Sequence, residues 1–313
     1  MTDPKRILVF QTAFLGDVIL TLPMIQVLHA KYPQALIDVV TTPAGSEFLS
    51  NHPAIAEIIK YDKRRAQKGL RGILALSIFL NRRKYNLAVV PHRSFRTSFI
   101  MALSGIPQRI GFSTASGTMF YHHIIRYDKT KHEVERNLSL LIPLGITSDN
   151  KELPTLYPSH HDVQFVNKFL FEREILEQTN LIAIAPGSVW NTKRWLPERF
   201  SQLARMLAND GYQILIVGGK EDAELGQLIC ETSVHKLIHN AAGKMTLLQS
   251  AELLRRCCVL VTNDSAPLHI GVAMRIPVVA IFGATVPEFG FAPYGDHDRV
   301  VETKGLSCRP CAI

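Results

Sequence analysis

The chain has 313 residues, of which 47% are hydrophobic and 20% are charged. This is the composition of a soluble globular protein that is long enough for two domains. No apolar run approaches the roughly 20 residues that a bilayer-spanning helix needs, and the opening MTDPKRILVF lacks the regions of a signal peptide. The five cysteines are an odd, sparse set that is typical of a reducing compartment. We therefore expect a cytoplasmic protein.

The formal net charge of +8 is carried by the first half of the chain. Residues 1–150 contain 19 Lys/Arg and 10 Asp/Glu, whereas residues 151–313 contain 16 and 17. This asymmetry favours an anionic partner for the first half: a phosphorylated substrate, a membrane surface or nucleic acid. Solvated helix faces would give the same pattern. Nucleic acid is the least favoured partner, because no stacking-aromatic pattern or known binding motif accompanies the charge.

Strands and helices alternate along the first half. Residues 6–11 (RILVFQ) are an apolar run too short for a helix, and residues 18–28 continue with a longer, helical one. Repeated alternation of this kind predicts an α/β fold with a doubly wound parallel sheet. The other predicted strands are residues 36–41, 57–61, 87–91, 109–112 and 124–127, and the other helices are residues 68–84, a segment ending near 103, and 132–141.

The pattern breaks at residues 147–161, which contain two prolines and mostly polar side chains. We interpret this segment as a linker between domains at 1–150 and 151–313, with a cleft between two facing carboxyl edges. In the second half we predict strands at residues 181–185, 213–217, near 237, 259–262, 278–282 and 300–301, and helices at 162–174, 197–209, 222–232 and 247–257, with another between 263 and 277.

The most informative stretch is residues 259–283, VLVTNDSAPLHIGVAMRIPVVAIFG. It reads as a buried strand, a polar turn at Asn263, Asp264 and Ser265, a helix that ends at Pro277, and a second strand. The helix therefore begins at the carboxyl edge of the sheet, where backbone N–H groups and the helix dipole favour phosphate. We expect an anionic group to bind here.

Other turns at strand ends carry candidate functional groups. The turn after the first strand contains Gly16 and Asp17, and neither G-x-G-x-x-G nor G-x-x-x-x-G-K-[ST] occurs in the chain. Asp17 is either a helix cap or a general base that takes a proton from an acceptor hydroxyl. Lys193, with Ser188 nearby, is either a diphosphate ligand or half of an exposed charged pair with Arg194.

The remaining candidates are weaker. Glu221 and Glu224 lie after a strand end, where a carboxylate commonly accepts hydrogen bonds from ribose, but either can be a solvated helix start. His269, taken alone, is more typical of a histidine with a structural role inside a helix. The D-H-D triplet at residues 296–298 and the lone C-x-x-C at 308–311 are weak metal motifs, so no metal is expected.

Taken together, these turns resemble the heptosyltransferases of glycosyltransferase family 9, which build the inner core of lipopolysaccharide. The resemblance covers nearly the whole chain, in order. The stretches that carry it are LGDVILTLPMI (15–25), HEVERNL (132–138), PGSVWNTKRWLPERF (186–200), ILIVGGKED (214–222), NDSAPLHIGVAMRIPVVAIFG (263–283) and LSCRPC (306–311).

The resemblance implies a GT-B architecture of two Rossmann-like domains and an inverting, metal-independent transferase without a cofactor. The C-terminal domain would hold the donor, ADP-heptose, and the N-terminal domain the lipid-linked lipopolysaccharide acceptor at the inner leaflet, with the protein peripheral at the cytoplasmic face of the inner membrane. By motif position, Asp17 would be the base, and the donor would be bound by Ser188, Lys193, Asp264, Ser265, His269 and either Glu221 or Glu224. On the acceptor side we expect Gly16, next to the base, and the basic groups Arg64, Arg65, Arg93 and Arg96, which would attract phosphates of the lipid core.

Two departures keep alternatives open. Ala266-Pro267 stands where many relatives carry Gly and an apolar residue, and the chain stops at Ile313 where relatives usually continue. The alternatives are a family 9 transferase with another sugar nucleotide or acceptor, a GT-B-like nucleotide-sugar 2-epimerase, and a truncated, non-catalytic binder of sugar nucleotides.

Overall fold

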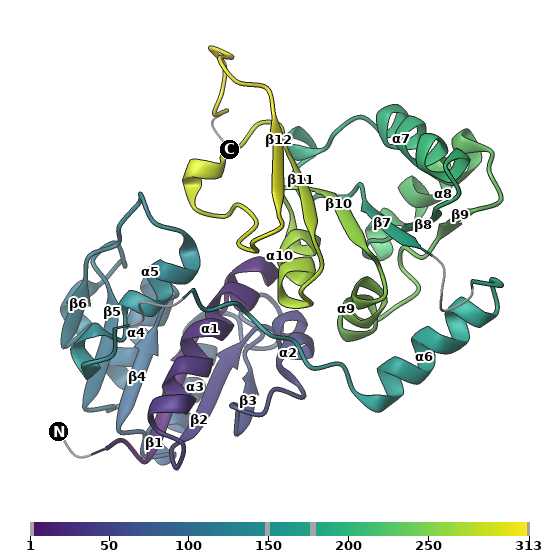
Figure 1. Ribbon diagram of the computed structural model, residues 1–313. Coiled ribbons are helices and arrows are strands. Elements are labelled where there is room, and N and C mark those ends of the chain that lie inside the picture. Colours follow the sequence, from purple (N-terminus) through teal and green to yellow (C-terminus); the bar gives the residue numbers. More distant parts are fainter. Residues whose placement is uncertain (1–2, 148–150, 176–179, 312–313) are drawn as a thin grey trace. The chain divides into compact units, whose positions relative to one another are not determined.

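The computed structural model describes residues 3–147, 151–175 and 180–311. The chain divides into two compact units, Met1–Thr155 and Leu156–Ile313 (Figure 1). The division falls inside the predicted linker, of which residues 148–150 lie outside the described residues. None of the helices in the described part of the chain has both the length and the hydropathy to cross a lipid bilayer.

The first unit is a six-stranded, wholly parallel sheet with strand order β3-β2-β1-β4-β5-β6. One face is covered by α1 with α2 and α5 beside it, and the other by α3 and α4 (Figure 1). The elements are β1 (Arg6–Phe10), α1 (Leu15–Lys31), β2 (Leu36–Thr41), α2 (Pro43–Leu49), β3 (Glu57–Lys60), α3 (Gly69–Arg82), β4 (Leu87–Val90), α4 (Phe95–Leu103), β5 (Gln108–Phe112), η1 (Thr118–Phe120), β6 (His123–Ile125), α5 (Glu133–Ser139) and η2 (Ile142–Leu144).

The second unit repeats this plan, with strand order β12-β11-β10-β7-β8-β9 and all neighbours parallel. Here α7 packs on α8, whereas α9 packs on α6 and α10. The elements are α6 (His160–Phe171), β7 (Leu181–Ala185), η3 (Asn191–Lys193), α7 (Pro197–Asn209), β8 (Gln213–Ile216), η4 (Lys220–Asp222), α8 (Ala223–Ser233), β9 (Ile238–Asn240), α9 (Leu247–Arg255), β10 (Val259–Asn263), α10 (Ala266–Ala273), β11 (Val278–Phe282), η5 (Pro287–Phe289) and β12 (Arg299–Glu302).

Both sheets therefore have the strand order of the Rossmann fold, and the predicted doubly wound α/β class is confirmed. The order reverses between β1 and β4 in the first unit and between β7 and β10 in the second. At such a reversal the two connecting loops diverge to opposite faces of the sheet, which leaves a crevice at the carboxyl ends of the strands. These two switch points are where the geometry favours a ligand.

The inner strands are buried on both faces, which explains their continuous apolar runs. Leu8 and Phe10 of β1 pack against α3 and α4, and the alternate residues Ile7 and Val9 are also fully buried. Sequence patterning missed α2, because it spans only seven residues; Thr42 caps it by accepting a hydrogen bond from the Gly45 N–H.

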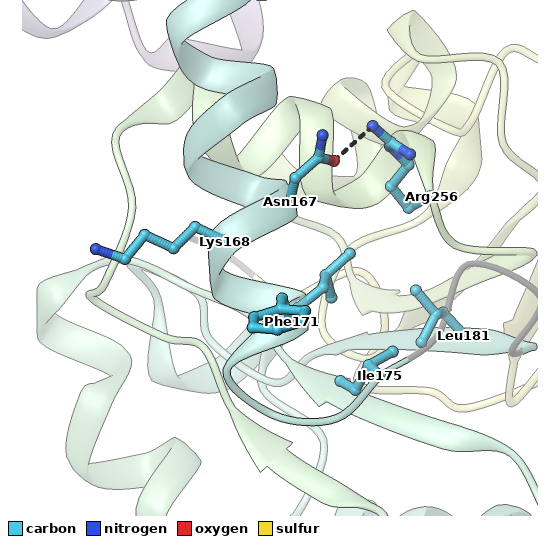
Figure 2. A pocket seen from close by; sticks show the side chains of 7 residues that line it. Asn167, Lys168, Phe171, Ile175, Leu181 and Arg256 are labelled. Carbon is cyan, nitrogen blue, oxygen red and sulfur yellow. Dashed lines mark hydrogen bonds between the residues drawn. The ribbon is translucent and has the colours of Figure 1, made fainter.

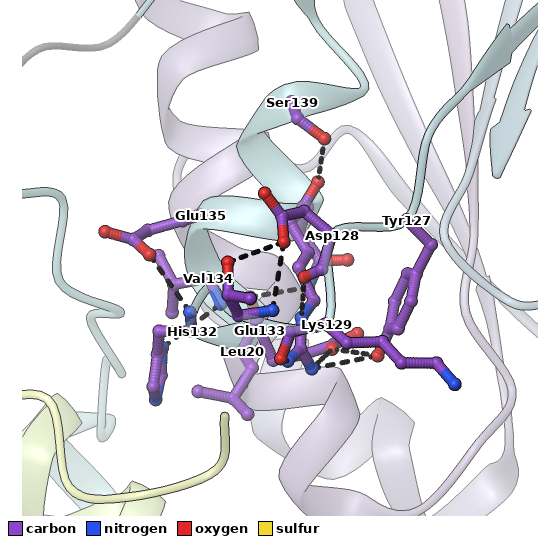
Figure 3. A network of polar contacts seen from close by, with 12 residues as sticks. Leu20, Tyr127, Asp128, Lys129, His132, Glu133, Val134, Glu135 and Ser139 are labelled. Atoms are coloured by element: carbon purple, nitrogen blue, oxygen red, sulfur yellow. Dashed lines mark hydrogen bonds and ion pairs between the residues drawn. The ribbon is translucent and has the colours of Figure 1, made fainter. Parts of the chain in front are cut away.

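A buried ion pair within α5, between Glu133 and Arg136, is the centre of a polar network that links this helix to its neighbours in the first unit (Figure 3). Arg136 donates to the Glu133 carboxylate at 3.0 Å and to the Tyr127 hydroxyl at 2.9 Å, and that hydroxyl donates to Glu133 at 2.7 Å. Asn137 reaches α1 by donating to the Leu20 carbonyl at 3.0 Å. The HEVERNL stretch thus has a structural role: it closes a polar network between α5, α1 and the loop after β6.

We expect Arg136→Met to destabilise the protein by about 3–5 kcal/mol, because it leaves the Glu133 carboxylate buried without its cation. Urea unfolding followed by far-ultraviolet circular dichroism measures the loss. Arg126→Met, at an exposed arginine of the same segment, is the matched control and should stay within about 0.5 kcal/mol of the parent. Equal stability of the two variants would contradict a structural role for the network.

Candidate functional site

The turn after β1 places Asp17 in the first turn of α1, which begins at Leu15 rather than at the predicted residue 18. Its Oδ2 accepts a hydrogen bond from the Phe14 N–H at 3.2 Å, and its carbonyl accepts one from the Thr21 hydroxyl at 2.7 Å. Asp17 is therefore a helix cap, as one of the two interpretations predicted, and Gly16 precedes it in the same turn.

The environment of Asp17 makes its carboxylate unusually basic. Burial and the negative charge of Glu133 raise the pKa of Asp17 to about 6, against the opposing effects of the Phe14 N–H and the Arg93 guanidinium. Glu133 belongs to the buried network on α5, so the structural network and the candidate base are electrostatically coupled. A carboxylate with this pKa is mostly ionised at neutral pH and still a better proton acceptor than an ordinary aspartate.

A polar cluster joins the ends of β1, β3 and β4. Lys63 donates to the Thr12 carbonyl at 2.7 Å. His92 Nδ1 lies 2.7 Å from the Thr97 hydroxyl and 3.4 Å from the Thr12 hydroxyl. Burial, Lys63 and Arg93 lower the pKa of His92 to about 4, and burial also lowers that of Lys63. The sequence interpretation did not select these groups as site residues; their positions directly after strands were the available signal.

The arginines predicted to meet the acceptor lie around this cluster in three different settings. Arg96 donates to the Tyr61 hydroxyl at 3.3 Å, and the Arg93 guanidinium sits 4.2 Å from the centre of the Tyr127 ring. Arg64 and Arg65 are exposed, and their backbone N–H groups bond to Asp62. The basic segment is thus split between packed and solvent-facing guanidinium groups.

Asp264 organises the switch point of the second unit. Its Oδ2 accepts from Lys193 Nζ at 2.6 Å and from the Thr285 hydroxyl at 2.6 Å, so one buried carboxylate joins the loops after β7, β10 and β11. Asn263 adds a second link, because its side chain donates to the Pro186 carbonyl at 2.7 Å and accepts from the Trp195 N–H at 2.9 Å. Lys193 is therefore a half-buried, ion-paired cation and not an exposed one.

The neighbouring donor-site candidates occupy this same edge. Ser188 is buried, and its carbonyl accepts two bonds from Arg194, at 2.8 and 2.6 Å. Ser265 is the N-cap residue of α10, with Ala266 and Pro267 in the first turn. Pro267 has no N–H, so the first turn offers an anion one donor fewer. His269 is buried within α10.

In the loop after β8, the carboxylate that bonds to the loop backbone is not one of those predicted. Glu221 and Glu224 are both exposed, whereas Asp222 is buried and accepts from the Gly219 N–H at 3.0 Å. Burial raises the pKa of Asp222. A Cβ at Gly187 would stand 2.1 Å from Asp222 Oδ1, so this close approach requires glycine. Sequence reasoning missed Asp222, because its burial depends on the approach of the loop at Gly187.

The weak metal motifs have structural partners. Asp298 accepts from the N–H groups of Val278 at 2.9 Å and Gly295 at 2.5 Å. In the C-x-x-C segment, the Cys311 N–H donates to the Ala284 carbonyl at 2.9 Å, and Arg309 donates to the Thr285 carbonyl. Within the described ranges, no group of three His, Cys, Asp or Glu side chains is arranged to hold a metal ion.

A cavity of about 570 Å³ lies apart from the second unit's switch point (Figure 2). It is bounded by the end of α6, by Arg256 after α9 and by Leu181, the first residue of β7. It therefore lies at the amino edge of the sheet, whereas open parallel sheets bind ligands at the carboxyl edge. We do not assign a ligand to it.

Two parallel sheets of Rossmann order in one chain are the architecture of the GT-B fold. The sequence profile of one family of glycosyltransferases matches residues 73–312. The chain belongs to glycosyltransferase family 9 (heptosyltransferase).

Known proteins resemble the chain along nearly its whole length. Lipopolysaccharide heptosyltransferase 2 of Escherichia coli K12 is 28% identical over 305 residues, which are 95% of this chain and 87% of that protein. The structure of the family 9 glycosyl transferase from Veillonella parvula has a TM-score of 0.88 at 30% identity and covers 96% of this chain and 86% of its own. The structure of E. coli ADP-heptose LPS heptosyltransferase II has a TM-score of 0.82 at 26% identity and covers 97% of this chain and 95% of its own. The predicted family and fold class are confirmed.

We expect Asp17→Asn to stabilise the protein at pH 7. The pKa of Asp17 in the folded protein, about 6, lies above the value of about 3.9 expected for an unfolded chain, so ionisation costs the folded state about 1–3 kcal/mol. Asparagine removes that cost, and its side-chain oxygen can still cap Phe14. The gain should shrink as the pH falls from 6 and vanish below about pH 4.

Urea unfolding of both proteins across this pH range measures the difference. The control is Asp128→Asn, because hydrogen bonds from Thr130 hold the pKa of Asp128 below its usual value. That substitution should give no gain at pH 7. A gain for Asp17→Asn that persists unchanged at pH 3 would contradict the charge-based explanation.

Proposed function

We propose that the protein transfers heptose from ADP-L-glycero-D-manno-heptose to the inner core of lipopolysaccharide, by an inverting mechanism without a metal ion. The observation that carries the proposal is the similarity, over 95% of this chain, to a protein named lipopolysaccharide heptosyltransferase 2. Two features support the proposal: a lysine held by Asp264 just before the α10 N-terminus of the second unit, and a carboxylate with a raised pKa, Asp17, in the first. These are the two groups that a displacement at an activated sugar requires.

The second unit is the proposed donor site. The diphosphate would lie at the α10 N-terminus, where Ser265 and the first-turn N–H groups favour negative charge. Lys193, held by Asp264, would neutralise charge that develops on ADP as it leaves. Ser188 and His269 would complete the site, and Glu221 or Glu224 would meet the ribose. Because Lys193 is already paired, the bound diphosphate has to share this cation with Asp264.

The first unit is the proposed acceptor site. Asp17 would take the proton from the acceptor hydroxyl, whose oxygen attacks the anomeric carbon while the bond to ADP breaks. Its pKa of about 6 suits this role at neutral pH. Gly16 lets the acceptor approach the turn, and Arg64, Arg65, Arg93 and Arg96 would bind phosphate groups of the lipid-linked core.

Such an acceptor is anchored in a membrane, so we propose that the protein works in the cytoplasm, peripherally at the inner face of the inner membrane. The charge excess of the first 150 residues supports this location.

Release of ADP from ADP-heptose, measured with and without heptose-deficient lipopolysaccharide, tests the activity. We expect release only when the acceptor is present, at a rate unchanged by EDTA. Consumption of donor without acceptor would indicate an epimerase instead, and donor binding without turnover would indicate a non-catalytic binder. Transfer that requires another sugar nucleotide would leave the family intact and contradict the proposed donor.

Asp17→Asn should abolish transfer, with at least a roughly 100-fold loss of kcat, because general-base contributions are of this size. Donor affinity, measured by calorimetry with ADP, should not change. In the parent protein, kcat/KM should fall with acid along a limb whose apparent pKa is near 6. Normal turnover by the variant would remove Asp17 from the mechanism.

Lys193→Met should weaken ADP binding by roughly 10- to 100-fold, the loss expected for a charge-assisted contact to phosphate. Lys236→Met replaces an exposed lysine at the amino edge of the same unit and serves as the control. Calorimetry with ADP compares the two variants. Equal affinities would show that Lys193 serves only the ion pair with Asp264.

A further inference from the structure

The outward face of α3 is apolar. Leu70, Leu74 and Ile78 recur at every fourth residue and are 69%, 49% and 54% exposed. Phe79, at the side of this stripe, is 38% exposed. The opposite face of the helix already packs on the sheet and on α4, through the buried residues Gly72, Ile73, Leu76, Ser77 and Leu80. The outer residues are therefore not part of the hydrophobic core.

A helix that is apolar on both faces normally lies inside a protein or against a partner. Isolated exposed leucines are common on protein surfaces, but a continuous stripe marks an interaction site. The neighbouring helix α4 extends the apolar character, because Phe95 is 57% exposed and stacks on Phe99. The face thus offers an apolar surface that water solvates poorly.

Positive charge flanks both ends of this stripe. Residues 63–86 contain eight Lys/Arg and no Asp or Glu. Exposed basic residues lie at both ends of α3: Arg64, Arg65, Lys68 and Arg71 before and within its first turn, and Arg82 and Lys84 at its other end. Lys63 and Arg83 are more enclosed. An apolar stripe with cationic ends matches the boundary between anionic headgroups and acyl chains.

We propose that the outer face of α3 docks on an anionic lipid bilayer. Leu70, Leu74 and Ile78 enter the headgroup–acyl boundary, and the flanking Lys68, Arg71, Arg82 and Lys84 contact lipid phosphates. A second copy of this face is a poorer partner, because symmetric pairing would bring two clusters of like charge together. The inference deepens the proposed function, since a lipid-linked acceptor requires the protein to reach a membrane.

Vesicle sedimentation with the full chain, without donor or acceptor, tests the docking. The vesicles are equimolar phosphatidylcholine and phosphatidylglycerol, compared with phosphatidylcholine alone. The parent protein should bind the anionic vesicles. Leu74→Glu should weaken that binding by roughly tenfold or more, because the variant loses a leucine that would be buried in the bilayer and gains a negative charge that anionic lipids repel. Leu228→Glu is the matched control: Leu228 lies on α8 of the second unit and is also 49% exposed. It should bind as the parent does.

The charge component is measured separately. Arg71→Gln should weaken binding by about fivefold, the effect of one basic residue near an anionic surface. Arg205→Gln, at an exposed arginine on α7, should have no effect. Added salt should reduce binding of the parent and narrow the gap between Arg71→Gln and the parent.

Two results would overturn the proposal: Leu74→Glu binding anionic vesicles as tightly as Leu228→Glu, or Leu74→Glu changing only the oligomeric state seen by light scattering. Transfer to a delipidated, water-soluble acceptor should be the same for Leu74→Glu and the parent. Failure of the parent in that transfer assay, with vesicle binding intact, would count against the proposed function and leave the docking surface in place.

Discussion

Parallel pairing with a reversal of strand order is the constraint on which both units depend. Every neighbouring pair in the two sheets is parallel, so all carboxyl ends of one sheet share an edge. The strands satisfy their own backbone groups, whereas the diverging loops after β1 and β4, and after β7 and β10, need side-chain partners. In the first unit Lys63 supplies one, by donating to the Thr12 carbonyl; in the second, Asn263 serves both the Pro186 carbonyl and the Trp195 N–H. Polar chemistry is thereby concentrated at two edges.

The two aspartates at these edges are used in opposite ways. Asp264 accepts from a cation and a hydroxyl, so its charge is compensated and it fixes the position of Lys193. The Asp17 carboxylate accepts a hydrogen bond from the Phe14 N–H, but its burial and the nearby Glu133 carboxylate raise its pKa. A compensated carboxylate orients a neighbour, and a poorly compensated one takes up protons. This contrast supports assigning binding to one unit and proton transfer to the other.

Local patterns were enough for the fold because the parallel strands are short apolar runs bounded by turn residues. The limits of β7, β11 and α7 agree with the predicted ones. The switch-point loops were also located, since Asp17, Lys193 and Asp264 belong to the segments that follow β1, β7 and β10. What sequence did not reveal depends on tertiary approach: Asp222 is distinguished from its neighbours only by its contact with the loop at Gly187. Likewise, the acidic partner of Asp17 comes from α5, more than a hundred residues away.

The same distinction explains α3. Its sequence is that of an ordinary amphipathic helix, because Ile73, Leu76 and Leu80 form a buried face that packs on the core. Only the packed structure shows that Leu70 and Leu74 remain outside, beside a segment without acidic residues. Exposed leucines on a stable helix give little to the folding free energy, so core packing does not account for them. Binding to a surface that is both apolar and anionic accounts for the side chains and for the charge asymmetry between the two halves of the chain.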